Sequence, residues 1–512
     1  MSLRINQPLP ASWLWVEIHQ VAEAITGNTP PTSDSSNFGG DIPFIKPTQL
    51  VDTPLSSAPE TLSDNGATNA RILPKGAVLV SCIGNLGKTA ILEKPGATNQ
   101  QINALVFQAL VNPKFGFFYA QTLEPWLNAV SSATTVSIVN KGKFETAPFP
   151  FAPTAEQTRI VEKLEELFSD LDAGVAELKA AQKKLAQYRQ SLLKAAVEGS
   201  LTAEWRTKNI PKETGTQLLE RILKERRTRW EEKQLAKFKE QGKTPPKGWQ
   251  DKYPEPVQPD TTNLPGLPEG CLWASLDQFF CELRSGTAET SGRQTTPYPV
   301  LKSSAVRQGK IDFQALNYLQ QKQSTRAENY LATGDVLITR LSGSVEYVGC
   351  CAVVQDVPTQ GVQFPDRIFQ GKLAPSFMWL GDYLAYCFQS AYVRIIIESA
   401  AKSTAGHKRI SLSDLYPLPI PLPPAVEIKS IIQQLYSGIE RAEAGEIAII
   451  HSLTQAAAQR KNILKSAFSG QLVVQDPNDE PASLLLERIR AERQKQASTL
   501  TRGRKTAKLD KK

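Results

Sequence analysis

The chain has 512 residues, and at roughly 100–200 residues per domain it has room for about three structural units. Hydrophobic residues make up 41% of the chain and charged residues 21%, which is ordinary globular composition and excludes a wholly disordered protein. The formal net charge of +8 permits a polyanionic partner but does not demand one.

Several other classes of protein are also excluded. The first thirteen residues lack the apolar stretch of a signal peptide, and no segment approaches the roughly 18–20 apolar residues of a membrane span. Six cysteines are too few for a disulfide scaffold, so we expect a cytoplasmic protein with reduced thiols. His19, His407 and His451 are far apart and no CxxC pair exists, so we expect no zinc site.

Residues 1–147 and 265–416 have the same character. Both contain short β-rich runs broken by Gly, Pro, Asn and Ser, which is typical of a mixed α/β domain with long surface loops. Ala77–Ile83 and Val336–Ile338 are predicted strands that follow a glycine turn. The overall prediction is an α+β fold with two such domains.

Residues 148–201 and 417–472 are each predicted to contain a proline cluster and then a long helix of about 45 residues, with Glu156 or Glu427 in its first turn. Apolar residues recur in them at three- and four-residue spacing, which indicates coiled-coil packing. The predicted packing residues are Ile160, Leu164, Leu167, Leu171, Leu178, Ile431, Leu435, Ile439, Ile449 and Leu453. A helix of this length needs a partner along its apolar stripe, and the other copy supplies one.

Two further segments follow the predicted helices. Residues 202–264 combine a densely charged stretch with a Pro-rich one, and we expect a charged helical extension and then a linker. Residues 473–512 are predicted to form a C-terminal helix and a basic tail, with no regular structure after Lys495.

The order of these segments is an internal repeat. Leu73–Val80 aligns with Leu331–Ile338 at an offset of 258 residues, and Leu193–Leu201 aligns with Leu464–Leu472 at an offset of 271. A period of this length is too long for a solenoid. The chain therefore consists of two copies of a module with one α/β part and one helical part, which gives a two-fold pseudo-repeat.

No catalytic motif is complete. Gly84–Thr89 ends like a phosphate-binding loop, but its first glycine is replaced by Cys82. Asn112–Phe115 lacks the second proline of the motif used by DNA amino-methyltransferases, and Pro365-Asp366 lacks the rest of a nuclease motif. These gaps favour a protein that recognises its partner without chemistry of its own.

Polar loop residues are the candidates for such recognition. Arg and Lys suit guanine edges and phosphates, and Asn suits adenine edges. The predicted DNA-binding residues are Lys46, Asn85, Lys88, Lys302, Arg307, Arg340, Lys402, His407, Lys408 and Arg409. Residues 1–147 hold nine basic and ten acidic residues, so a DNA-binding first domain must share its phosphate contacts with a partner.

Two stretches carry a resemblance to a known family. Leu418-Pro-Ile-Pro-Leu-Pro-Pro-Ala-Val-Glu427 and Ile463-Leu-Lys-Ser-Ala-Phe-Ser-Gly-Gln-Leu472 each have a counterpart in the first copy, at 149–157 and 192–201. With the order of segments, this resembles the specificity subunit of a type I restriction-modification enzyme over essentially the whole chain. In the first copy the usual Pro-Leu-Pro-Pro is Pro-Phe-Ala-Pro, and in the second Glu-Gln is replaced by Glu427-Ile428.

The resemblance implies a division of labour. Each α/β domain would be a target-recognition domain for one half of a split site on double-stranded DNA, and the two helices would pair as an antiparallel coiled-coil spacer. Two methyltransferase subunits would carry S-adenosylmethionine, and two restriction (motor-nuclease) subunits would use ATP and Mg. The chain itself would bind no cofactor or metal and would have no catalytic residues.

Two rival interpretations stay open at the level of sequence. A self-contained DNA methyltransferase or nuclease would modify or cut DNA alone, and the incomplete motifs argue against it. A coiled-coil scaffold with two protein- or glycan-binding lobes would show no sequence-specific DNA binding, even with a methyltransferase present.

Overall fold

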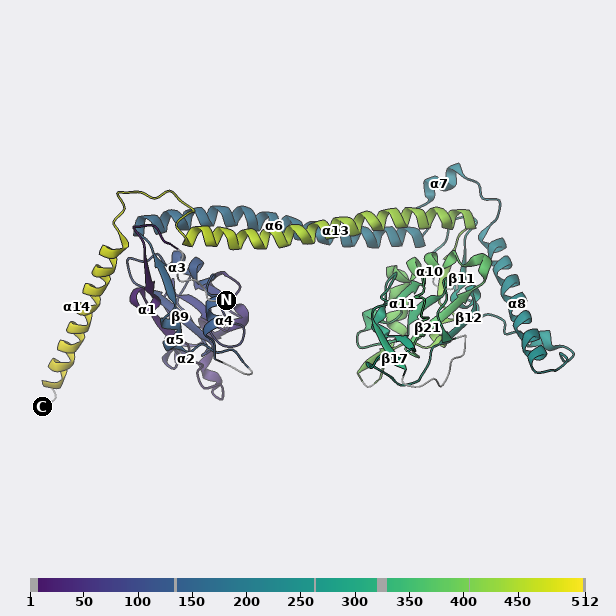
Figure 1. Ribbon diagram of the computed structural model, residues 1–512, viewed down its shortest axis with the longest axis horizontal. Coiled ribbons are helices and arrows are strands. Elements are labelled where there is room, and N and C mark those ends of the chain that lie inside the picture. Colours follow the sequence, from purple (N-terminus) through teal and green to yellow (C-terminus); the bar gives the residue numbers. More distant parts are fainter. Residues whose placement is uncertain (1–7, 133–135, 262–263, 320–328, 405, 510–512) are drawn as a thin grey trace. The chain divides into compact units, whose positions relative to one another are not determined.

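The computed structural model describes residues 8–132, 136–261, 264–319, 329–404 and 406–509 (Figure 1). The chain divides into two compact units, of which unit 1 comprises residues 1–179 and 450–512 and unit 2 comprises residues 180–449. Each unit holds one α+β lobe together with parts of two long helices, α6 (Thr154–Val197) and α13 (Ala425–Phe468). None of the helices in the described ranges has the length and apolarity to cross a membrane.

The lobe of unit 1, which we call lobe 1, is built on a five-stranded sheet and a three-stranded sheet. The five-stranded sheet runs in the order β2 (Ala22–Thr26), β9 (Ile102–Phe107), β6 (Val78–Ser81), β7 (Thr89–Leu92) and β4 (Thr53–Leu55). The other sheet runs β5 (Glu60–Leu62), β3 (Phe38–Ile45) and β8 (Ala97–Thr98). The α-helices of the lobe are α1 (Ile18–Val21), α2 (Asp64–Thr68), α3 (Pro113–Ala120), α4 (Glu124–Val130) and α5 (Lys141–Glu145).

The lobe of unit 2, which we call lobe 2, has a four-stranded antiparallel sheet and smaller sheets around it. The main sheet runs β12 (Phe280–Ser285), β21 (Ile368–Leu373), β18 (Val336–Thr339) and β20 (Cys351–Val353). The smaller sheets are β13 (Ser291–Gly292), β17 (Leu316–Leu319) and β14 (Pro299–Leu301); β15 (Val306–Arg307) and β16 (Lys310–Ile311); and β19 (Leu341–Ser342), β23 (His407–Arg409) and β22 (Lys402–Thr404). The α-helices are α9 (Leu276–Phe279), α10 (Leu380–Gln389), α11 (Ala391–Ala400) and α12 (Leu412–Leu415).

The proline clusters before the long helices form short strands. Pro148–Phe151 forms strand β10, which pairs antiparallel with β1 (Leu14–Glu17), and Pro419–Leu422 forms β24, which pairs with β11 (Leu272–Ser275). Prolines are tolerated because each sheet has two strands, and an edge strand can leave backbone positions without a donor. The long helices begin at Thr154 and Ala425, just after the proline clusters, and they have Glu156 and Glu427 in their first turns as predicted.

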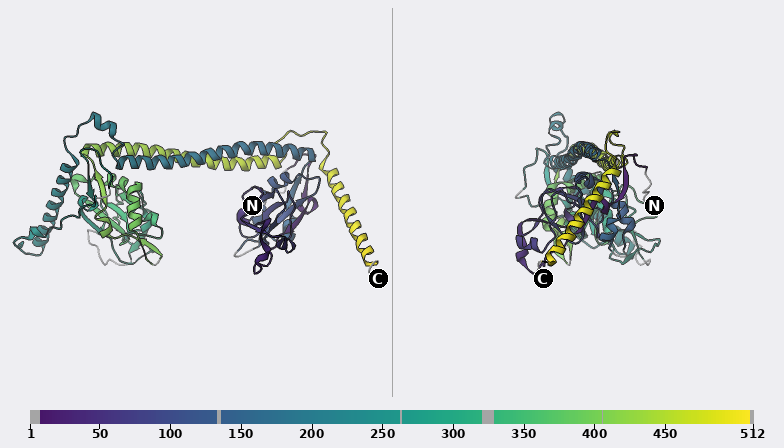
Figure 2. Two further views of the ribbon diagram at one scale, coloured as in Figure 1. Left: turned by 180° about the vertical axis from the view of Figure 1, so that it is seen from behind. Right: turned by 90° about the vertical axis from the view of Figure 1, so that its left-hand side faces the viewer.

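The long helices pair antiparallel within both units (Figures 1 and 2). In unit 1, Arg460 Nη1 of α13 lies 2.9 Å from Asp172 Oδ1 of α6. In unit 2, a Cβ atom on Gly438 of α13 would lie 2.6 Å from Leu192 of α6. Residue numbers on α6 thus rise as those of their α13 partners fall, which is the antiparallel arrangement that the family resemblance implied.

The ends of these helices belong to the cores of the lobes. Ile160 and Leu164 are fully buried in one hydrophobic core with residues of lobe 1, and Ile431 and Leu435 are fully buried in the core of lobe 2. Ile439 and Ile449 are also buried, whereas Leu167, Leu171, Leu178 and Leu453 are only half-buried. Away from the lobes a helix can bury its stripe only against one other helix, which covers a narrower face.

The segments after the long helices are themselves helical. Residues after α6 form α7 (Ala203–Lys208) and the charged helix α8 (Gly215–Glu240), and α14 (Ala482–Leu509) follows α13. The prediction that regular structure ends at Lys495 is therefore wrong, since α14 continues to Leu509. Most residues of this stretch, including Ala, Leu, Arg and Lys, have good helix propensity, and this outweighs the repulsion between its charges.

Each long helix begins with a buried carboxylate. Glu156 accepts a hydrogen bond from Trp13 Nε1 at 2.8 Å and another from Gln475, in the segment after α13. Glu427, the equivalent residue 271 positions later, accepts from Thr202 Oγ1 at 2.6 Å and from Arg206, in the segment after α6. The start of each long helix is thus joined to the segment that follows the other.

Candidate nucleic-acid interface

Five of the predicted DNA-binding residues come together in lobe 2, on or directly beside the small sheet of strands β19, β23 and β22. We call this the basic sheet. Strand β23 pairs with both of its neighbours, so that Arg409 lies opposite Leu341 on one side and Lys402 on the other. The Ile410 N–H donates to the Arg340 carbonyl at 3.0 Å, which places Arg340 at its edge. The five residues are Arg340, Lys402, His407, Lys408 and Arg409.

Strand alternation distributes these side chains. His407 and Arg409 are exposed and Lys408 between them is half-buried, as expected for neighbours that point to opposite faces of a strand. Gly406, with φ +80°, lies in the connection from β22 to β23, a backbone conformation that side-chain-bearing residues rarely adopt. The sheet therefore presents imidazole, guanidinium and ammonium groups from one short hairpin.

Arg340 is held more firmly than the exposed cations. Its Nη1 donates to the Asp366 carbonyl at 3.1 Å, and its guanidinium carbon lies 5.7 Å from the centre of the Phe369 ring. The planar guanidinium has five N–H donors, so this contact leaves others to serve a base edge or a phosphate. Its orientation is fixed before any ligand binds.

Lys302 and Arg307 lie close to the same sheet. Lys302 precedes the short helix η4 (Ser303–Ala305), and both η4 and η6 (Val345–Tyr347) contact β19. The Arg307 guanidinium stacks on the Tyr347 ring, 4.4 Å from its centre. Lys302 thus lies next to one element that contacts β19, and Arg307 stacks on a residue of another.

In lobe 1 the three candidates do not gather. Asn85 and Lys88 lie in one turn, where the Asn85 carbonyl accepts from Ser81 Oγ at 2.6 Å and the Lys88 N–H donates to the same hydroxyl at 2.9 Å. Lys46 follows β3 in the other sheet, and its ammonium forms an ion pair with Glu60. Both side chains of this pair are exposed, and an exposed ion pair holds its cation only weakly.

Sequence analysis missed Arg367. This exposed residue directly precedes β21, and its carbonyl accepts a hydrogen bond from the Arg340 N–H at 2.8 Å. The only signal in the sequence is its place next to Pro365-Asp366, the incomplete start of a nuclease motif. Arg367 adds a cation beside Arg340.

Burial makes three of the cysteines poor nucleophiles. Burial raises the pKa of the Cys387 thiol to about 12 and those of Cys82 and Cys271 to about 11, which keeps these sulfurs protonated near neutral pH. Within the described ranges, no three His, Cys, Asp or Glu side chains are grouped so that they could hold a metal ion.

The chain is similar in sequence to known DNA specificity subunits. Residues 10–180 match the model of the type I restriction modification DNA specificity domain. The chain is 24% identical to the type I restriction enzyme EcoKI specificity subunit of Escherichia coli K12, over 95% of this chain and 96% of the relative. It is 22% identical to the StySPI specificity subunit of Salmonella potsdam, with the same coverage of both chains.

A solved structure has the same fold. It comes from work titled "Structural basis underlying complex assembly and conformational transition of the type I R-M system", and it matches with a TM-score of 0.62 at 16% identity, over 91% of this chain and 100% of its own. Residues 10–180 are therefore similar to the type I restriction modification DNA specificity domain, and the whole chain is similar in sequence to the specificity subunits of type I restriction enzymes.

Proposed function

We propose that this chain is the DNA sequence-specificity subunit of a type I restriction-modification complex. It would recognise a split DNA site, with one lobe for each half, and position methyltransferase and restriction subunits on it. The observation that carries the proposal is the duplicated module: each lobe is built into one end of α6 and the opposite end of α13. Full-length similarity to specificity subunits supports it.

The helix pair suits the role of a spacer. A 44-residue α-helix is about 66 Å long, and one turn of DNA is roughly 34 Å. Two recognition lobes fixed to such a pair would meet base sequences separated by a constant number of unread base pairs.

The chemistry would belong to the partner subunits. Two methyltransferase subunits would bring S-adenosylmethionine, and two restriction subunits would bring ATP and Mg, while this chain would act without catalytic residues. The near-neutral charge of residues 1–147 fits this division, because phosphate contacts at lobe 1 would then be shared with a methyltransferase. A base must also be flipped out for methylation, which makes a firmly positioned duplex important.

Selection of binding sites from random duplex DNA tests the proposal. The chain would be co-purified with its methyltransferase partner, and bound DNA would be recovered and sequenced over several rounds. We expect two short sequence blocks separated by a gap of constant length. Recovery of one continuous block, or of no sequence preference, would contradict the proposal.

A further inference from the structure

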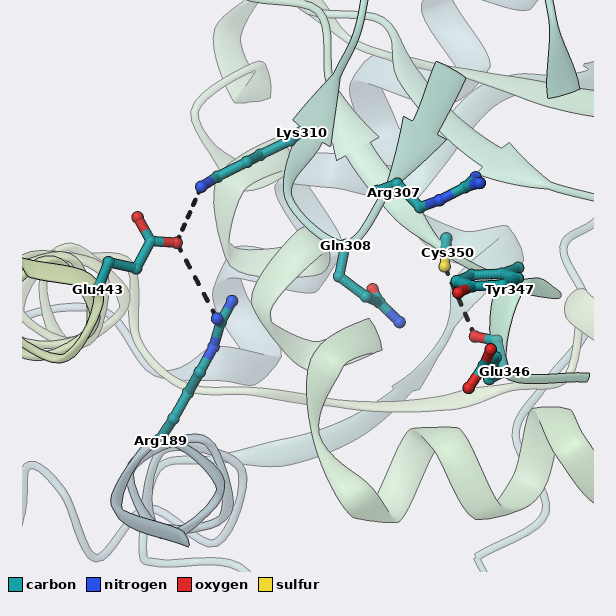
Figure 3. Close-up of a pocket in the computed structure, with 8 residues that line it drawn as sticks. All are labelled: Arg189, Arg307, Gln308, Lys310, Glu346, Tyr347, Cys350 and Glu443. Carbon is teal, nitrogen blue, oxygen red and sulfur yellow. Dashed lines mark hydrogen bonds and ion pairs between the residues drawn. The ribbon is translucent and has the colours of Figure 1, made fainter. Parts of the chain in front are cut away.

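A polar network in unit 2 joins lobe 2 to both long helices. Arg189 of α6 donates from Nη2 to Gln389 Oε1 of α10 at 3.1 Å, and its Nη1 lies 4.0 Å from Glu443 Oε1 of α13. The same carboxylate oxygen accepts from Lys310 Nζ of β16 at 3.0 Å. Figure 3 shows the Glu443 carboxylate facing both cations. We call these four residues the hinge network.

The network is anchored on the side of the lobe by a buried amide. Gln389 is only 7% exposed, and its Nε2 donates to the Ala385 carbonyl one turn earlier in α10 at 3.1 Å. This bond fixes the amide so that Oε1 faces Arg189. A buried carbonyl oxygen that loses its donor costs free energy, so the Arg189–Gln389 contact favours one placement of α10 against α6.

The network lies beyond the apolar attachment of the lobe. In the core that lobe 2 shares with α13, the buried residues of α13 run from Ile428 to Ile439. Glu443 is one helical turn further toward the middle of α13. A contact beyond the end of the core resists rocking of the lobe about that core, because it acts at a greater distance from the pivot.

The network also adjoins a candidate DNA contact. Arg189, Lys310 and Glu443 line a cavity of about 400 Å³ together with Arg307 and Tyr347. Arg307 and Lys310 belong to the paired strands β15 and β16, which form one short hairpin. A change in the contact between Lys310 and Glu443 of α13 would therefore move the hairpin that carries Arg307.

The other copy provides an internal comparison. Arg460 and Asp172 are the equivalents of Arg189 and Glu443 at the offset of 271, and they form the same kind of pair between α13 and α6. At this level of the helix pair, however, lobe 1 makes an aromatic contact. The ring of Phe118 packs on the ring of Phe168 of α6, with their centres 5.6 Å apart. The Arg460 guanidinium stacks on the same Phe168 ring, 4.0 Å from its centre. The repeat has thus kept the pair between the helices but attaches the two lobes differently.

We propose that the hinge network is a positioning device that fixes the orientation of lobe 2 on the helix pair, and so restricts the spacer lengths at which both half-sites can be bound. The inference rests on the proposed function, because a spacer exists only if the site is split. Arg189, Gln389, Glu443 and Lys310 act here through the lobe that they orient and need not touch DNA.

The test measures spacer selectivity on the assembled complex. The chain with its methyltransferase partner would be titrated with duplexes that carry both half-sites at the preferred spacer and at one base pair more or less. For Arg189→Ala and Gln389→Ala we expect the ratio of affinities for the preferred and altered spacers to fall by about two- to tenfold, the range that one hydrogen bond supports. In the double variant this ratio of affinities should fall no further than in the single variants, because both substitutions remove the same hydrogen bond.

Two control variants separate this role from a general structural one. Arg441→Ala removes an exposed arginine of α13 whose side chain bonds only its own helix, to Ser437, and it should leave the ratio unchanged. Arg460→Ala breaks the equivalent pair between the helices in unit 1, where lobe 1 is attached through Phe118, and it should also leave the ratio unchanged. None of the variants removes the Lys310–Glu443 ion pair, so the hairpin of Arg307 keeps its contact with α13. Affinity for a duplex with only one half-site should therefore stay the same in all variants.

The failures are distinguishable. If the wild-type complex prefers no spacer at all, the proposed function itself falls, and this inference falls with it. If the wild type is selective and Arg189→Ala and Gln389→Ala are equally selective, only the inference is overturned. If Arg460→Ala broadens the preference as much as Arg189→Ala, pairing of the helices, and not the attachment of lobe 2, sets the spacer.

Discussion

Arg340 lies beside the basic sheet of lobe 2, and Lys408 lies within it. Substitution of these two residues tests the role of the basic sheet in DNA recognition most directly. We expect Arg340→Ala or Lys408→Ala to weaken recognition of one half-site by about 1–3 kcal/mol and to leave the other unaffected, as for the loss of one base or phosphate contact. Binding titrations with duplexes mutated in either half measure this.

Lys194→Ala is a suitable control for this experiment. Lys194 is an exposed cation of α6 that pairs with Glu198 on its own helix. Its replacement by alanine removes one positive charge, as the Arg340 and Lys408 substitutions do. It should alter the affinity for neither half-site. Equal loss at both half-sites in the Arg340 or Lys408 variants, or no loss at either, would show that these residues were wrongly chosen.

Glu156 gives a prediction of pH dependence. Burial raises the pKa of this carboxyl, against the opposing effect of hydrogen bonds from Trp13 and Gln475. A raised pKa in the folded state means that this contribution to stability is fully present below the ordinary glutamate pKa of about 4.3 and is lost as the pH rises through the raised value. Glutamine at this position cannot ionise and lacks this dependence.

The free energy of unfolding of the wild type should therefore decline relative to that of Glu156→Gln as the pH is raised from 4 to 7. Urea denaturation of both proteins at several pH values measures the difference. Glu162→Gln, at an exposed position on the same helix, serves as the control for the substitution itself. A difference between wild type and Glu156→Gln that stays constant across this pH range would contradict the assignment.

At the scale of single elements, the glycines of the helix pair rank by the space around them. A Cβ atom on Gly174 would meet nothing within 4 Å, one on the equivalent Gly445 would lie 3.1 Å from Leu185, and one on Gly438 would lie 2.6 Å from Leu192. Alanine in an open helical position stabilises by roughly 0.5–1 kcal/mol. We expect Gly174→Ala to gain this amount, Gly445→Ala less, and Gly438→Ala least or none. Chemical denaturation gives the order, and a reversed order would mean that the helices pack differently.

The elements also show which parts of the fold the sequence could predict. The long helices were predictable because their apolar spacing is a local signal that continues for more than forty residues. The strands at Pro148–Phe151 and Pro419–Leu422 were not, because each exists through pairing with a strand more than a hundred residues earlier in the chain. Proline indicates a break in a helix but carries no information about such a distant partner.

The candidate site divides in the same way. Residue types alone identified Arg340 and the cations of 402–409, but their assembly on one sheet depends on the pairing of β19 with β23. The exposed ion pair between Lys46, directly after β3, and Glu60 of the neighbouring strand β5 could not be foreseen from the sequence. Arg367 was missed because it lies in a loop that only the fold brings to Arg340.

At the scale of the whole molecule, the length of the helix pair should set the gap between the half-sites. Seven residues inserted after Lys179 in α6 and after Ile449 in α13 add two helical turns, or about 10 Å, which corresponds to roughly three base pairs. We expect the preferred spacer to lengthen by about this number while both half-site sequences stay unchanged. Site selection with the lengthened chain measures it, and a changed half-site sequence would contradict the assignment of spacing to the helices.

The central claim is that this chain gives a methylating complex its split recognition sequence. Long-read mapping of methylated bases in host DNA, with and without the gene for this chain, tests it most directly. We predict one methylated motif, made of two short blocks and a gap of fixed length, that disappears on deletion and returns on complementation. Unchanged methylation across the genome in a host whose partner methyltransferase is expressed and active would contradict the account.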